Sequence, residues 1–302
     1  MSDFIPSAVR EGIEGLARAF FGRDGPAGAE SAKVPRRDGI ALALGGGAAL
    51  GWAHIGVLRV LQEENVPVAA VSGTSIGALA ALCFAADRLD VLEEIARGAT
   101  RVRVLSYLDP HIGREAMLGG RRIARELAMH FGERRFEDMP MPTSVIAADL
   151  LTGEEVRLAS GPVVDAVAAS MALPGIFRPV KRDGRTLVDG GMVANVPVGA
   201  VRELAPGAPV VAVHLMDDYE GYVASLGPGP YTALRTLRMA FLMMAAKLDR
   251  QSLFLDRPEV LIAPRLGRFG TGAFTRAAEL IEIGREAVTA ALPAIRAAQA
   301  LP

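Results

Sequence analysis

The 302-residue chain carries 33 basic and 34 acidic side chains, so its formal net charge at pH 7 is −1. Without a basic excess it has little charge to neutralise a run of phosphates, which argues against a nucleic-acid-binding protein. Hydrophobic residues make up 51% of the chain and aromatic residues 5%, so small and aliphatic side chains must supply the core. The one cysteine, Cys83, cannot form an internal disulfide, and its apolar neighbours predict a small buried side chain.

Residues 1–38 differ in composition from the rest of the chain. Within residues 4–21, apolar side chains recur every three or four positions with charged residues between them, which predicts an amphipathic helix. Residues 22–38 are rich in Gly, Ala, Pro and charge, as is typical of a linker. We therefore expect an N-terminal arm at 1–38, ahead of a domain at 39–302. The helix could dock on this domain, on a second subunit or on a membrane, and its mixed charges favour protein.

The N-terminal residues lack the basic and apolar pattern of a secretory signal. No apolar run reaches the ~18 residues that a membrane-spanning helix needs. We expect a cytoplasmic protein that is either soluble or peripheral at the inner face of the membrane.

Short apolar segments alternate with glycine turns and helices from residue 39 onward. The strands predicted from these segments are 40–44, 66–71, 144–148, 210–213 and 259–262. Helices are predicted directly after the first two strands, at 53–64 and 76–87. This repeated order of strand, turn and helix predicts an α/β fold with a mostly parallel sheet and helices on both faces.

The segment 231–256 is also predicted to be helical, and its middle, residues 239–246, is apolar with basic residues on either side. It is too short to span a membrane, so it is either a core helix or an adaptable surface that contacts lipid. The apolar run favours a core helix. Together with residues 4–21, the segment is our candidate for peripheral membrane contact.

Gly73-Thr74-Ser75-Ile76-Gly77 lies between a predicted strand and a predicted helix. In this context a G-x-S-x-G sequence is typical of a sharp turn that exposes a nucleophilic serine. Gly73 and Gly77 permit the close backbone approaches of such a turn. The helix N-terminus that follows Ser75 favours developing negative charge.

Gly45, Gly46 and Gly47 follow the first predicted strand and open a helix. Three glycines expose amide groups that can bind an oxyanion or a phosphate. A glycine-rich first turn is also a dinucleotide-binding signal, although no Gly-Lys-Ser/Thr follows, so a P-loop is excluded. By itself the glycine run leaves both alternatives open. A third segment places Asp189 before Gly190 and Gly191, which alone would be read as a turn.

Taken together and in this order, the three segments resemble the patatin-like phospholipases, in particular the bacterial branch related to neuropathy target esterase. The resemblance runs from about residue 40 to about residue 291 and includes the segments 52–58, 148–153, 169–180 and 187–197. It implies a three-layer sandwich with a mostly parallel central sheet flanked by helices. It also implies a metal-independent hydrolase of (lyso)phospholipids or related acyl lipids that uses no cofactor and forms an acyl-enzyme.

The resemblance also implies roles for individual residues. Ser75 would be the nucleophile and Asp189 its base, without a catalytic histidine. Gly45, Gly46 and Gly47 would supply oxyanion-hole amides, helped by the amide of Ile76. The supporting motif glycines are Gly73, Gly77, Gly190 and Gly191. Two positions depart from the family pattern, because Leu50 replaces a usually basic residue and Ala48 replaces a frequent glycine.

Three other functions fit parts of the sequence. The order Ser75, Asp189, His214 matches the Ser-Asp-His order of α/β-hydrolases, although His214 ends an apolar strand and the glycine loop comes too early. A nucleotide-binding module would explain the glycine loop and nothing else. A non-catalytic lipid-binding relative would be compatible with Leu50, but the chain retains both Ser75 and Asp189.

Overall fold

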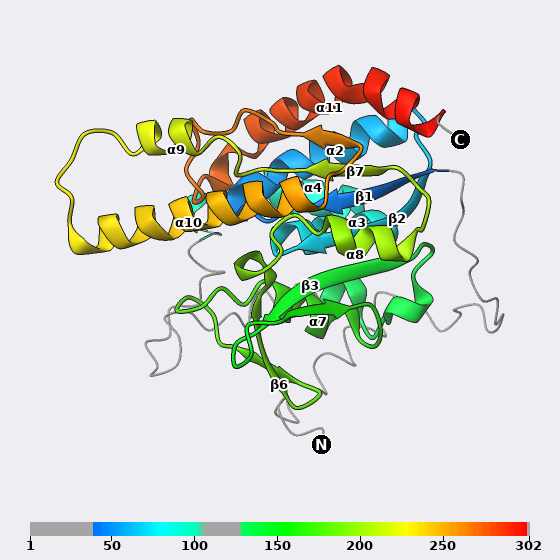
Figure 1. The fold of residues 1–302 in the computed structure, drawn as a ribbon, viewed down its shortest axis with the longest axis horizontal. Helices are drawn as coiled ribbons and strands as arrows, with labels where there is room; N and C mark the ends of the chain where they lie inside the picture. The colour runs from blue at the N-terminus through cyan, green and yellow to red at the C-terminus, as the bar shows by residue number, and fades with distance from the viewer. Residues whose placement is uncertain (1–38, 103, 105–127, 301–302) are drawn as a thin grey trace.

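The structure, a computed structural model, describes residues 39–102, 104 and 128–300 (Figure 1). The helix predicted at 4–21 and the linker predicted at 22–38 lie outside the described residues. The division into an arm at 1–38 and a domain at 39–302 therefore stays a prediction.

Within the described residues the strands form one sheet in the order β5-β6-β3-β2-β1-β7-β8, and β4 pairs with β3. The strands are β1 (Ile40–Leu44), β2 (Val68–Thr74), β3 (Thr143–Asp149), β4 (Glu155–Leu158), β5 (Val180–Arg182), β6 (Arg185–Asp189), β7 (Val210–Val213) and β8 (Val260–Ile262). Five neighbouring strands pair in parallel, namely β3, β2, β1, β7 and β8. Strands β4 and β6 run antiparallel to β3, and β5 runs antiparallel to β6. The prediction of a mostly parallel sheet is confirmed.

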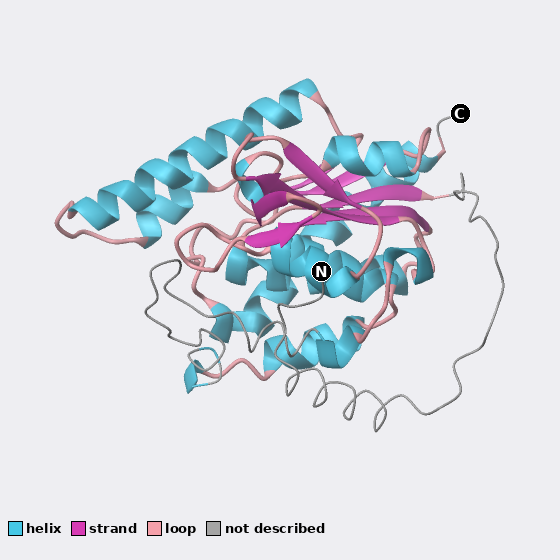
Figure 2. Ribbon diagram, turned by 90° about the horizontal axis from the view of Figure 1, so that it is seen from below, coloured by secondary structure: helices cyan, strands magenta, loops and turns pink. Residues whose placement is uncertain are grey.

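Helices lie on both sides of the sheet (Figure 2). The α-helices are α2 (Trp52–Glu63), α3 (Ile76–Ala85), α4 (Leu89–Arg97), α7 (Val163–Ser170), α8 (Val198–Leu204), α9 (Tyr219–Ser225), α10 (Ala233–Leu255) and α11 (Ala277–Gln299). Short 3-10 helices are η1 (Ala48–Gly51), η2 (Phe136–Asp138), η3 (Gly190–Met192) and η4 (Phe274–Arg276).

Successive residues of β1 point to opposite faces of the sheet. Ile40, Leu42 and Leu44 join the large apolar cluster that includes α2, α3 and α11. The intervening residues, Ala41 and Ala43, join a smaller cluster with α8 and Leu253 of α10. Both faces are therefore covered, as the three-layer sandwich requires.

Most predicted elements are present with shifted boundaries. The strand predicted at 66–71 runs instead from Val68 to Thr74, because its parallel pairing with β1 continues to the Leu44–Gly73 pair. The predicted helix 76–87 ends at Ala85, and Asp87 has a positive φ of 56°. Cys83 is buried as predicted, and burial raises the pKa of its thiol to about 12.

Helices α2 and α11 pack at very close range. A Cβ at Gly56 of α2 would lie 1.9 Å from the carbonyl oxygen of Ile281, and a Cβ at Gly284 of α11 would lie 2.0 Å from that of Ala53. Both contacts are with backbone, which cannot move without shifting a helix. Each glycine is thus required by the partner helix.

Gly56→Ala is accordingly expected to lower the free energy of unfolding by about 3 kcal/mol, because α11 must move away from α2. Urea denaturation followed by circular dichroism measures the change. Gly270→Ala is the matched control, since a Cβ there would have no neighbour within 4 Å. Equal stability of the two variants would show that the helices separate at little cost.

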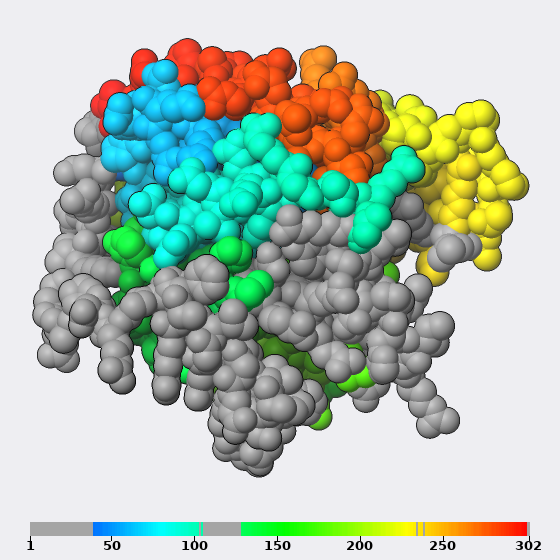
Figure 3. All heavy atoms as spheres, turned by 180° about the vertical axis from the view of Figure 1, so that it is seen from behind, coloured from blue at the N-terminus to red at the C-terminus, as the bar shows by residue number. Residues whose placement is uncertain are grey.

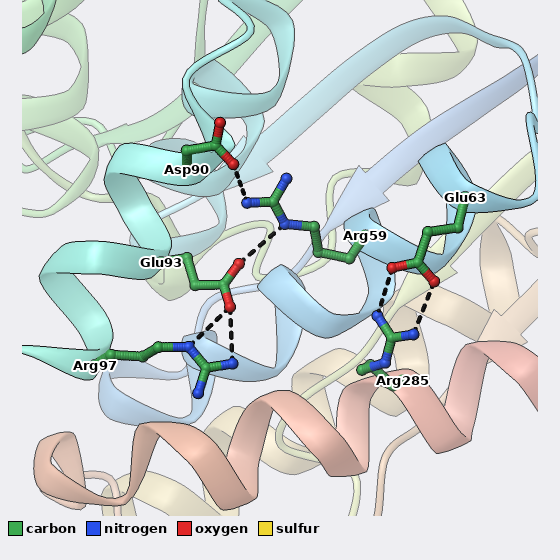
Figure 4. A network of polar contacts seen from close by, with 6 residues as sticks. All are labelled: Arg59, Glu63, Asp90, Glu93, Arg97 and Arg285. Atoms are coloured by element: carbon green, nitrogen blue, oxygen red, sulfur yellow. Dashed lines mark hydrogen bonds and ion pairs between the residues drawn. The ribbon is translucent and has the colours of Figure 1, made fainter.

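Ion pairs at the surface connect α2 with α4 and with α11. Arg59 of α2 binds Asp90 and Glu93 of α4, with 3.0 Å between its Nε and Glu93 Oε2. Figure 4 shows the full network, which comprises Arg59, Glu63, Asp90, Glu93, Arg97 and Arg285. These side chains are partly or largely exposed, so each pair contributes little to stability. The apolar contacts beneath them hold α2, α4 and α11 together.

Candidate active site

Ser75 lies on a sharp turn between β2 and α3 (Figure 1). Its backbone has φ 56° and ψ −121°, a conformation that side-chain-bearing residues rarely adopt. A Cβ at Gly73 would lie 2.1 Å from the carbonyl oxygen of Gly77, and one at Gly77 would lie 2.2 Å from that of Leu44. Backbone crowding therefore requires both glycines, and the turn has the strained geometry of a nucleophile elbow.

Asp189 lies directly opposite this serine. The Ser75 hydroxyl donates a hydrogen bond to Asp189 Oδ2, and the Oγ–Oδ2 distance is 2.6 Å. Asp189 ends β6, which is separated from β2 by the intervening strand β3. Gly190 lets the chain pass closely over β3, because a Cβ there would lie 2.4 Å from the carbonyl oxygen of Ile146. The amide of Gly191 donates to Asp189 Oδ1 at 2.8 Å, which leaves Oδ2 for the serine.

The environment of Asp189 makes it a better base than a carboxylate in water. The side chain is buried, and this burial raises its pKa to about 6. Hydrogen bonds from the Ser75 hydroxyl and the Gly191 amide act in the opposite direction, but they are smaller effects. At neutral pH the carboxylate is ionised, with a proton affinity suited to general base catalysis.

Ser170 holds the backbone of Ser75 in place. The amide of Ser75 donates to Ser170 Oγ at 2.9 Å, and the Ser170 hydroxyl donates to the carbonyl oxygen of Ile146 at 2.6 Å. Thr74 Oγ1 donates to the carbonyl oxygen of Ala194 at 2.8 Å, which ties the turn to the segment after Asp189. Sequence reasoning assigned no role to Ser170. The one available signal was a polar residue at the end of an apolar helix within the 169–180 motif.

The glycine loop lies against Ser75, since a Cβ at Gly46 would be 3.3 Å from Ser75 Cβ. However, the amide of Gly45 donates to the carbonyl oxygen of Val213 at 2.9 Å. The amide of Gly46 is shared between the backbone oxygen and Oδ1 of Asn195, both at 3.1 Å. The predicted oxyanion role thus conflicts with these bonds at Gly45 and Gly46. Among the described residues, the amides of Gly47 and Ile76 have no protein partner.

Asn195 connects the loop to a buried polar pair. Its Nδ2 donates to Asp249 Oδ2 of α10 at 2.8 Å, and His214 Nε2 donates to the same oxygen at 2.9 Å. Asp249 and His214 are almost fully buried. His214 therefore binds Asp249, while Ser75 binds Asp189 directly, so the Ser75–Asp189–His214 triad is not formed. Sequence reasoning missed Asp249, although it is the one acidic residue of α10.

His54 fixes the end of β1. Its Nε2 donates to the carbonyl oxygen of Gly45 at 2.7 Å, and burial lowers its pKa to about 4. The imidazole is consequently neutral at physiological pH. It holds the loop through a hydrogen bond and carries no charge to the site.

The two departures from the family pattern have local explanations. Ala48 has a positive φ of 51°, a conformation in which glycine is favoured, which fits the frequent glycine of the family. Leu50 is buried in the same apolar cluster as Leu215 and Leu266. It faces the core and, with Leu215 and Leu266, lines a small pocket there.

Two further findings concern the described residues alone. No three His, Cys, Asp or Glu side chains in this part of the chain lie close enough together to hold a metal ion. No helix in it is both long enough and apolar enough to cross a membrane.

A family model described as patatin-like phospholipase matches residues 42–202, which is more than half of the chain. The chain belongs to the patatin-like phospholipase family. The matched residues include the glycine loop, which by itself was also compatible with a nucleotide-binding turn.

Named relatives belong to the same family. One uncharacterized NTE family protein of Mycobacterium tuberculosis is 37% identical over 162 residues, covering 54% of this chain and 45% of the relative. A second uncharacterized NTE family protein from that organism is 30% identical over 307 residues, covering 95% of this chain and 49% of the relative. Patatin-like phospholipase domain-containing protein 7 of Mus musculus is 35% identical over 188 residues, covering 60% of this chain and 14% of the mouse protein. The chain thus matches about half the length of the mycobacterial relatives, and much less of the mouse protein.

Among solved structures, VipD from Legionella pneumophila is similar with a TM-score of 0.47 and 13% sequence identity. The match covers 86% of this chain and 67% of that chain.

Proposed function

We propose that this protein is a serine acyl hydrolase that cleaves carboxylic ester bonds of (lyso)phospholipids or related acyl lipids through a Ser75–Asp189 dyad. The observation that carries the proposal is the 2.6 Å hydrogen bond between Ser75 Oγ and Asp189 Oδ2, at a serine held in a strained strand-to-helix turn. Family membership supports the lipid substrate class. Within that class, the branch that the chain resembles favours lysophospholipids and simple acyl esters.

The proposed reaction has two halves. In the first, Asp189 accepts the hydroxyl proton as Ser75 Oγ attacks the ester carbonyl, and the tetrahedral intermediate collapses to an acyl-serine. The leaving alcohol takes the proton back from Asp189. In the second half, Asp189 removes a proton from water as the water attacks the acyl-serine. The second tetrahedral intermediate then releases the fatty acid by breaking its bond to Ser75 Oγ, which takes the proton back from Asp189. This sequence needs no metal or organic cofactor.

The oxyanion of each tetrahedral intermediate would be bound by the amides of Gly47 and Ile76. Both are free of protein partners among the described residues. Ile76 directly follows Ser75, and Gly47 follows Gly46, where a Cβ would lie 3.3 Å from Ser75 Cβ. Ile76 is also the first residue of α3, where the helix dipole favours negative charge. Gly45 and Gly46 would then shape the loop, because their amides hold it to β7 and to Asn195.

The location and organisation of the protein are part of the same proposal. We place the hydrolase domain at 39–302, in the cytoplasm, with peripheral contact to the inner face of the membrane.

Ser75→Ala is expected to reduce release of p-nitrophenol from a medium-chain acyl ester at least ~1,000-fold, because the nucleophile is lost. A fluorophosphonate probe should label the wild type on the peptide containing Ser75 and leave the variant unlabelled. Ser160→Ala, at an exposed serine outside the site, is the control and should retain activity. Full activity of Ser75→Ala, or a wild type inert on both acyl esters and lysophosphatidylcholine, would contradict the proposal.

A further inference from the structure

Helix α10 is apolar on two opposite faces. The inner face packs on the domain and consists of buried residues spaced four, three and four apart: Leu242, Ala246, Asp249 and Leu253. The outer face repeats this spacing with residues that are 69%, 42%, 67% and 38% exposed: Leu237, Phe241, Met244 and Leu248. Helical geometry places the two sets on opposite sides. The segment that was predicted to be a core helix therefore packs against the core with its inner face, while its outer face is exposed.

An exposed apolar stripe is unusual on a helix that packs against its own domain, because the outer face of such a helix is normally polar. The charges of α10 add to this. Apart from the buried Asp249, the charged residues of the helix are all basic: Arg235, Arg238, Lys247 and Arg250. An apolar stripe accompanied by basic charge matches an anionic lipid surface, which offers both acyl chains and phosphates.

The position of the stripe relative to Ser75 points to the same partner. Figure 1 shows α9 and α10 as a hairpin that extends beyond the sheet on the side toward which β1 points. Ser75 follows the carboxyl end of β2, which is parallel to β1, so it lies at this edge too. Viewed from behind in Figure 3, the hairpin (yellow) again forms the periphery of the molecule.

A second exposed apolar pair lies at the same edge. Leu150 and Leu151 are 51% and 79% exposed and directly follow β3, which is parallel to β2. Two apolar surfaces from separate parts of the chain therefore lie at the edge that carries the candidate nucleophile.

We propose that the outer face of α10 docks on an anionic lipid bilayer, with Leu237, Phe241 and Met244 inserted among the acyl chains. The exposed Lys247, which helical spacing places at the flank of the stripe, would then contact lipid phosphates. The inner face keeps its contacts, so Asp249 continues to hold Asn195 and, through it, the glycine loop. The choice of lipid as substrate rests on the proposed function, whereas the docking itself requires no turnover.

Vesicle co-sedimentation tests the proposal with the full chain carrying Ser75→Ala, so that no lipid is consumed. The parent should bind vesicles that contain phosphatidylglycerol more strongly than pure phosphatidylcholine. Adding Leu237→Gln, Phe241→Gln and Met244→Gln should weaken partitioning at least tenfold on both. Adding Lys247→Gln should weaken binding to the anionic vesicles selectively, and added salt should do the same to the parent.

Val102→Gln is the matched control, since it changes an apolar residue that is 78% exposed outside α10. Thermal unfolding should show that the triple variant is folded. With Ser75 intact, that variant should hydrolyse a soluble p-nitrophenyl ester within about twofold of the wild type, because the exchanged side chains lie on the outer face and Asp249 on the inner face still holds Asn195. Unchanged vesicle binding by the triple variant would overturn the proposal. It would also be overturned if the parent proved to be a dimer and the three substitutions only converted it to a monomer. Strong vesicle binding by a protein inert on esters would contradict the proposed function and leave the docking proposal standing.

Discussion

Replacing Asp189 with asparagine is expected to lower kcat for ester hydrolysis by about 1,000-fold or more, because the amide cannot accept the proton of Ser75. The shape of the side chain is kept, so KM for a soluble ester should change little. Steady-state kinetics with a p-nitrophenyl ester measures both constants. Asp183→Asn is the control, because Asp183 is an exposed turn residue whose φ of 50° asparagine tolerates. An Asp189→Asn variant that retains a tenth of the wild-type kcat would rule out the dyad.

The same residue predicts the pH profile of the wild type. Because burial raises the pKa of Asp189 to about 6, kcat/KM should rise with pH through about 6 and then level off as the base becomes ionised. Stability should respond in the opposite direction. Because the pKa of Asp189 is raised, its protonated form stabilises the folded state. This stabilisation is present at low pH and is lost as pH increases from about 4 to about 6. An acid limb centred near pH 4 would show that the catalytic base is an unperturbed carboxyl group.

Asp249→Ala is expected to lower the free energy of unfolding by about 3 kcal/mol, because the buried His214 Nε2 and the half-buried Asn195 Nδ2 lose their shared acceptor. It should also lower kcat by ~10- to 100-fold, since Asn195 would no longer hold Gly46 and the loop would shift from the nucleophile. Urea denaturation and ester kinetics at a temperature where the variant is folded separate the two effects.

Asp256→Ala provides the comparison for this experiment. Asp256 follows α10 directly, is partly exposed and pairs with Arg202, so its loss should cost less than about 1 kcal/mol and leave kcat unchanged. If Asp249→Ala lost stability alone, with kcat intact, the polar pair would serve only to hold α10 on the domain. If KM rose and kcat stayed unchanged, the glycine loop would stabilise the bound substrate and the transition state equally.

Local sequence patterns were sufficient to predict the α/β class, the five strands that pair in parallel and the serine turn, whereas β4, β5 and β6 were not predicted. The reason is physical: a short apolar run followed by glycines has few backbone conformations that bury the run and still permit a tight turn. At Gly73 and Gly77 the pattern and the structure agree, because the backbone oxygens nearby leave no room for a Cβ. Boundaries were less accurate. The parallel pairing of β2 with β1 carried that strand past its predicted end, and such pairing is a property of the whole sheet.

Only the tertiary structure determined how the functional groups are connected. Ser75 and Asp189 are 114 residues apart, and their hydrogen bond exists because Gly190 crosses β3 at close range. The resemblance implied that the amides of Gly45 and Gly46 belong to the oxyanion hole. In the structure the Gly45 amide donates to Val213 of β7 and the Gly46 amide donates to Asn195. A run of glycines in the sequence does not show which of its amides already have a partner. The exposed stripe of α10 was hidden for a similar reason. Its apolar residues have helical spacing on both faces, and packing against the domain buries one face while the other remains open to a partner.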